Sequence, residues 1–109
     1  MNKSSHQIVL CTCPDPETAT KIAKVLVDDG LAACVNIQPS VASVYRWQGK
    51  TETATESLMI IKSLAENYSQ IEKKIVELHP YELPEVIAVP IVAGLKPYLA
   101  WLSCPEKVL

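Results

Sequence analysis

The alternation of apolar and polar positions along the chain predicts both strands and helices. Gln7–Cys13 is a short apolar run that ends at a proline-rich turn, which is typical of a central strand buried on both faces. Over Ala19–Val27 the apolar residues recur at helical spacing instead. Asp15 can cap this helix, Pro16 suits its first position, and Gly30 is the expected left-handed stop.

The middle of the chain predicts a long β-hairpin. Leu31–Ile37 is expected to form a strand that ends at Pro39, and Val41–Trp47 continues as extended chain. A Gln-Gly-Lys turn at residues 48–50 leads into a returning strand over Thr51–Lys62, which is most apolar near its end. Two extended runs joined by so short a turn indicate a hairpin.

A second helix and a last strand follow the hairpin. The apolar residues that predict this helix recur at alternating steps of four and three, and they are Leu64, Tyr68, Ile71, Ile75 and Leu78. Ser63 with Glu66 three residues later fits a capping box at the helix start, and Pro80 ends the helix. After a polar connector, Val86–Val92 is expected to form a strand, and Pro90 favours an edge position for it.

The element order is therefore β-α-β-β-α-β, and Tyr98–Leu102 is expected to add a short C-terminal helix. This is the split β-α-β topology of an α+β ferredoxin-like sandwich, with both helices on one face of the sheet. A length of 109 residues suits a single domain over residues 1–109. Because the strands carry few charges on either face, we expect oligomerisation through the sheets or the hairpin edges.

Composition narrows the classes of partner. Hydrophobic residues make up 49% of the chain, aromatic residues only 6%, and phenylalanine is absent, so the core must be aliphatic. A net charge of -2 argues against nucleic acid or an anionic membrane as partner, because phosphate contacts need a basic patch. No segment of the sequence approaches the ~18 apolar residues of a membrane span, and the N-terminus does not resemble a signal peptide. We therefore expect a cytoplasmic protein whose four cysteines stay reduced.

The connector at residues 79–85 combines an imidazole, a phenol and two carboxylates in a short segment. Its ionisable residues are His79, Tyr81, Glu82 and Glu85. Pro80 and Pro84 hold it stiff, and rigid polar loops are where scaffolds usually present ligand contacts. An ordered helix-to-strand turn that happens to carry polar residues explains the same pattern.

Cys11 and Cys13 lie two residues apart on the first strand, so their side chains point to one face. Thiolates and imidazoles suit copper and zinc well, which makes Cys11 and His79 candidate ligands. Cys13 either extends such a site or is an incidental surface thiol. The alternative for Cys11 is packing as a small apolar side chain, and for His79 it is a protonated imidazole favoured by the helix dipole.

Five segments follow one another along nearly the whole chain: VLCTCPDPETA, LAACVNIQPSVASVYRWQG, ESLMIIKS, HPYELPEV and YLAWL. In this order they resemble the CutA divalent-cation tolerance proteins. The resemblance implies a small cytoplasmic homotrimer that is not an enzyme, binds divalent copper (Cu2+) and takes part in metal tolerance. It implies Cys11 and His79 as copper ligands, whereas Leu78 occupies the position of a second histidine in some members. Two ligands per chain leave a tetrahedral site incomplete, so exchangeable binding is expected.

The same resemblance implies an alternative function, because the CutA architecture is similar to the trimeric PII-type signalling proteins. A cleft between subunits would then bind a small metabolite, and a protein partner would recognise the liganded state. The candidate cleft residues are Tyr45, Trp47, Glu56, Lys62, Tyr81, Glu82 and Glu85. An aromatic pair near a hairpin turn is also a simple interface anchor, and the connector carboxylates are also explained as solvated groups.

Overall fold

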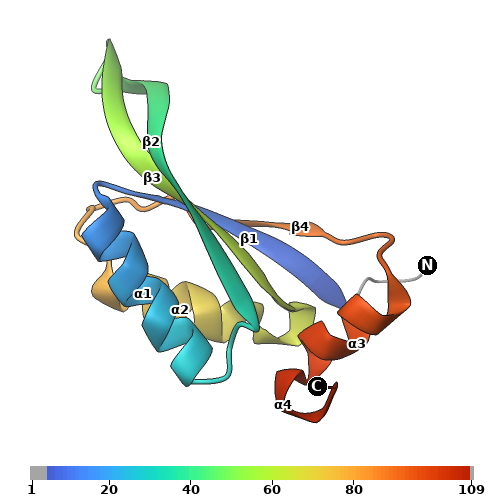
Figure 1. Cartoon of the computed structure of the whole chain (residues 1–109). Coiled ribbons are helices and arrows are strands. Elements are labelled where there is room, and N and C mark those ends of the chain that lie inside the picture. The colour runs from blue at the N-terminus through green and yellow to red at the C-terminus, as the bar shows by residue number, and fades with distance from the viewer. Residues whose placement is uncertain (1–4, 109) are drawn as a thin grey trace.

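The computed structural model describes residues 5–108 of the chain. These residues form a four-stranded antiparallel sheet with helices on one face (Figure 1). Residues 1–4 and 109 of the predicted domain lie outside the described residues. The strands are β1 (His6–Cys13), β2 (Cys34–Trp47), β3 (Lys50–Leu64) and β4 (Ile87–Pro90). The helices are α1 (Pro16–Asp28), α2 (Tyr68–Leu78), α3 (Lys96–Ser103) and α4 (Pro105–Val108). The strand order β2-β3-β1-β4 confirms the α+β ferredoxin-like fold.

The hydrophobic core lies between the sheet and the helices α1 and α2. Its largest fully buried side chains include Val9, Cys11, Met59 and Ile61 from the sheet, and Ile22, Leu26, Ile71 and Ile75 from the helices. Positions along β1 alternate between buried and half-buried. The prediction that β1 is buried on both faces is therefore wrong for this chain, because the helices close only one side.

The opposite face of the sheet is apolar and only partly covered. Leu10 pairs with Ile60 on β3 and with Ile87 on β4, so these side chains lie next to one another. Ile87 is 51% exposed, and Val89, which pairs with Ile8, is 45% exposed. Exposed apolar surface of this kind commonly marks an interface.

The helix α1 begins and stops where the sequence predicts. Asp15 is its N-cap and accepts a hydrogen bond from the Thr18 backbone N–H at 2.7 Å, and Pro16 occupies the first turn. The hydrogen bond favours the carboxylate and so lowers the pKa of Asp15 below its usual value. Gly30 takes the left-handed conformation, with φ +73°.

The strand β2 is more continuous than the sequence predicts. It begins at Cys34, not at Leu31, and it continues through Pro39 to the hairpin turn. A bulge between Gln38 and Val41 makes this continuity compatible with the proline. Proline has no backbone N–H to donate. Because β2 lies at the edge of the sheet, a missing N–H on its outer side removes no hydrogen bond to another strand.

The hairpin projects past the rest of the sheet as a two-stranded arm (Figure 1). The pairing of β1 with β3 runs from Leu64 only to Ser57, whereas β2 and β3 stay paired up to Trp47 and Lys50. The longest dimension of the molecule is 46 Å. The arm therefore has both of its faces away from the helices.

The capping box predicted at Ser63 is wrong. Ser63 belongs to β3, is buried, and accepts a hydrogen bond from Gln7 Nε2 at 3.1 Å. The strand extends to Leu64, and α2 begins at Tyr68 after a short 3-10 turn. Pairing with β1 therefore outweighs the local capping preference of the serine.

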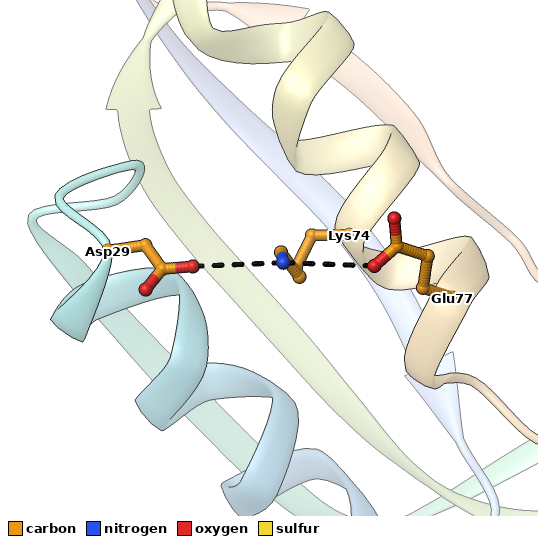
Figure 2. Close-up of polar contacts among 3 residues, drawn as sticks. All are labelled: Asp29, Lys74 and Glu77. Carbon is orange, nitrogen blue, oxygen red and sulfur yellow. Dashed lines mark ion pairs between the residues drawn. The ribbon is translucent and has the colours of Figure 1, made fainter.

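An ion-pair group joins the C-terminal end of α1 to α2 (Figure 2). Lys74 Nζ lies 3.9 Å from Asp29 Oδ2 and 3.7 Å from Glu77 Oε2. All three side chains are a third to a half exposed, so the pairs contribute little to stability. The two helices are held mainly by their buried apolar faces.

The last strand is shorter than the predicted Val86–Val92, since β4 covers only Ile87–Pro90, at the second sheet edge. The predicted C-terminal helix is present as α3, which contacts β1 and β3 and buries Leu102. His6 Nε2 lies 3.1 Å from the Leu99 carbonyl oxygen. Across residues 5–108, the helices are all too short or too polar to cross a membrane.

Candidate metal centre

Cys11, Cys13 and His79 meet where the end of β1 approaches the connector after α2. Their ligand atoms all lie within 4.8 Å of one another, and all three residues are buried. The alternation of β1 turns both cysteines to the helix side of the sheet. Pro80 disfavours helical geometry at the preceding residue, so α2 ends at Leu78 and His79 is extended, with ψ 136°.

Both ring nitrogens of His79 take part in hydrogen bonds within the chain. Nδ1 accepts from the Tyr81 backbone N–H at 3.1 Å, so the proton is on Nε2, which donates to the Thr12 carbonyl oxygen at 2.7 Å. These two hydrogen bonds hold the ring between β1 and the connector. Because Thr12 lies between the two cysteines, its bond to Nε2 holds the imidazole beside the end of β1 that carries both thiols.

The two thiols of the group influence each other. Interaction with the Cys13 thiol and burial raise the pKa of Cys11 above its usual value, and interaction with Cys11 lowers the pKa of Cys13. The negative charges of Glu85 and Glu56 raise the pKa of Cys11 further. Because thiolates are the ligand form, metal binding at this pair would release protons.

Tyr81 and Glu56 lie beside the group. The Tyr81 hydroxyl donates to Glu56 Oε2 at 2.7 Å, and its ring centroid lies 4.6 Å from that of His79. Burial and then the hydrogen bond to Glu56 raise the pKa of Tyr81, so the phenol stays protonated. Two of the predicted cleft residues, Tyr81 and Glu56, therefore meet here. Tyr45 pairs with Glu52, four residues before Glu56 on β3.

The other predicted cleft residues do not join them within one chain. Lys62 is six residues from Glu56 along β3, about 20 Å at the rise of a strand, and it donates to Asn36 Oδ1. Trp47 lies beside the hairpin turn and is 43% exposed. Glu82 is exposed on the connector, and Glu85, also exposed, acts on Cys11 only through its charge. A single chain therefore does not assemble the whole predicted cleft.

The donors of this group fit a thiophilic metal ion. Thiolates and imidazoles are ligands of zinc and copper. Metal–ligand distances of about 2.0–2.3 Å put three ligands of one ion roughly 3.3–4.0 Å apart in tetrahedral or trigonal geometry. Donors that lie within 4.8 Å of one another would therefore have to move together on binding. His79 would have to exchange one hydrogen bond for the metal. The sequence alone assigns Cys13 no definite role. The signal for a ligand role is its two-residue spacing from Cys11, which places both side chains on one face of the strand.

Comparison with known sequences gives one consistent result. The family model described as "CutA1 divalent ion tolerance protein" matches residues 7–104. The "Divalent-cation tolerance protein CutA" of Thermus thermophilus is 44% identical over 97 residues, which are 89% of this chain and 94% of that protein. "Protein CutA, chloroplastic" of Arabidopsis thaliana is 42% identical over 96 residues, which are 88% of this chain but only 53% of the plant protein. The chain likewise spans 61% of the Xenopus laevis relative.

Solved structures agree with the sequence comparison. The Thermus thermophilus structure superposes with a TM-score of 0.88 at 43% identity, over 90% of this chain and 95% of that one. A structure described as the periplasmic divalent cation tolerance protein CutA from Archaeoglobus fulgidus has a TM-score of 0.88 at 40% identity. It covers 95% of this chain and 99% of its own. The fold is thus shared over nearly the whole chain.

Proposed function

Because this chain belongs to the CutA1 divalent ion tolerance protein family, we propose that it binds copper and takes part in the response to that metal. The family is one of metal-tolerance proteins and not of enzymes. The observation that carries the proposal is the meeting of Cys11, Cys13 and His79, with all ligand atoms within 4.8 Å.

In this proposal Cys11 and His79 bind a copper ion that is supplied as Cu2+ and exchanges with the medium. Leu78 packs against the core and offers no donor, so the site lacks a second histidine ligand from this helix end. An incompletely coordinated ion leaves more readily than one in a closed tetrahedral site. Weak, exchangeable binding suits a buffer or sensor better than a structural metal.

A titration of Cu2+ into the fully reduced protein, under anaerobic conditions, tests the proposal. We expect saturable binding that is lost in Cys11→Ala and in His79→Ala, because each change removes one donor. Binding is followed by the electron paramagnetic resonance signal of the metal. Free thiols are counted after the titration, so that oxidation of cysteine by Cu2+ is recognised.

Cys104→Ser is the matched control, since Cys104 is a partly buried thiol at the end of α3, outside the group. It should bind as the wild type does. If Cys11→Ala and His79→Ala also bind unchanged, these two residues are not the ligands and the proposed site is wrong.

We further propose that the protein works as a homotrimer in the cytoplasm. The apolar face of the sheet supports an assembly, and the number three comes from the resemblance to CutA proteins. The named relatives differ in compartment, since one is called chloroplastic and another periplasmic. Fractionation of the source cells, with antibody detection of the protein, tests the location.

A further inference from the structure

We infer that Cys13 is a third metal ligand, and that the Cys11–Cys13–His79 group prefers a soft, closed-shell cation, Cu(I) or Zn(II), over Cu(II). This inference rests on the proposed function, because it assumes that metal binds at Cys11 and His79. It adds a ligand and a class of cation to that proposal.

The position of Cys13 supports a ligand role. Its side chain is fully buried on the same face as that of Cys11. Both cysteines are held by strand pairing, since Cys11 is opposite Met59 and Cys13 is opposite Ser57. A central strand fixes the spacing of the two sulfur atoms without help from a mobile loop, which is a favourable arrangement for a binding site.

The third donor of the group, His79, comes from the segment after α2 and not from β1. His79 is tied to the carbonyl of Thr12, the residue between the two cysteines, and to the backbone N–H of Tyr81. Packing alone accounts for a buried cysteine. The bond to Thr12 brings the imidazole to β1, and the alternation of β1 turns both thiols to one face, so three donor atoms lie within 4.8 Å of one another. Three donors from two separated segments thus converge on one point.

The donor types select the cation. The group contains two sulfur atoms and one nitrogen atom, and within the described part of the chain no carboxylate oxygen belongs to it. Soft thiolate ligands favour Cu(I) and Zn(II), whereas Cu(II) prefers tetragonal arrangements of nitrogen and oxygen donors. All three residues are buried, which limits the water that could complete a tetragonal shell. A cation that accepts few ligands, most of them sulfur, fits this group best.

Competition titrations on the reduced full-length chain test the inference. Zn(II) and Cu(I) are each titrated anaerobically against a chromogenic chelator of that ion, for the wild type, Cys13→Ser and Cys13→Ala. We expect both Cys13 variants to lose more affinity than the about 10–100-fold that an outer-shell partner contributes. Cys34→Ser, a change at a partly buried thiol on β2, is the control and should bind unchanged.

X-ray absorption spectra of the wild-type complex with each ion give an independent readout. Two sulfur ligands in the wild type support the inference, and one or none overturns it, whether or not the variants fold. Wild-type affinity for Cu(II) above that for Cu(I) also overturns the cation preference.

Different results would overturn the proposed function and the inference about Cys13. If neither ion nor Cu2+ binds, or if Cys11→Ala and His79→Ala have no effect, the proposed function is wrong. If those variants abolish binding while Cys13→Ser binds as the wild type does, only the inference about Cys13 is wrong.

Discussion

At the scale of single residues, His79 has a structural role that is independent of any metal. Its ring is hydrogen-bonded to the Thr12 carbonyl oxygen on β1 and to the Tyr81 backbone N–H in the connector. We expect His79→Ala to lower the free energy of unfolding by about 1–3 kcal/mol, because two polar backbone groups lose their partner. Urea denaturation of the metal-free protein measures this difference.

Glu82→Ala is the control for His79→Ala, because Glu82 is an exposed residue of the same connector. Its effect should stay within about 0.5 kcal/mol. Equal effects of the two changes would mean that the hydrogen bonds of His79 do not anchor the connector.

The N-cap of α1 makes stability depend on pH. The pKa of Asp15 in the folded protein lies below 3.8, the ordinary value. The stabilisation by its carboxylate is therefore fully present above pH 3.8 and is lost as the pH falls through the lower folded pKa. We expect wild type to lose stability relative to Asp15→Asn on acidification below that pH, since the amide caps the helix without titrating.

Thermal melts of both proteins between acidic and neutral pH check this expectation. Parallel stability curves through the acidic range would show that the carboxylate of Asp15 makes no pH-dependent contribution.

At the scale of elements, α2 is held to the sheet by a narrow apolar stripe. Ile75 is fully buried, whereas its neighbour Val76 is 56% exposed. We expect Ile75→Ala to destabilise the protein by about 2–5 kcal/mol through lost burial and a residual cavity. Val76→Ala, the matched control, should change stability by no more than about 0.5 kcal/mol.

Urea denaturation separates these two variants. Similar losses in both would indicate that α2 is not anchored by the face that its sequence periodicity predicts.

Elements with local signals could be predicted from the sequence. The cap at Asp15, the stop at Gly30 and the hairpin turn depend on residues next to one another. The start of α2 and the course of β2 could not be predicted, because each depends on a distant strand. Ser63 has the local pattern of a helix cap, but it pairs with Gln7, which is 56 positions away. Pro39 has the local pattern of a strand end, but β2 continues through it at a bulge. A bulge has no clear local signature in the sequence, so this continuation could not be predicted.

The candidate site was predictable only in part for the same reason. Strand parity alone places Cys11 and Cys13 on one face. Their meeting with His79 depends on how β1 passes the connector, which only the assembled sheet determines. The contact between Tyr81 and Glu56 joins residues 25 positions apart, and no spacing in the sequence indicates it.

At the scale of the whole molecule, the apolar sheet face predicts an assembly. We expect the wild type to sediment at three times the chain mass of 12.0 kDa. We expect Val89→Asp to dissociate it, because an unpaired charge is costly inside an apolar interface. Val89 is half-exposed in the single chain, so this change should leave the fold intact.

Val76→Asp is the control for assembly, since Val76 is exposed on α2, on the helix side of the sheet. It should sediment as the wild type does. A well-folded wild-type species at the mass of one chain would exclude the trimer, and with it any binding cleft formed between subunits.

The central place of β1 in the sheet has a consequence for biosynthesis. Both neighbours of β1 in the sheet, β3 and β4, follow it in the sequence and are translated after it. Pairings between segments so distant in sequence close slowly, and the last of them requires residues 87–90. A nascent chain stalled before Ile87 would therefore carry an apolar strand with one edge unpaired, and such edges favour aggregation until the last strand is made.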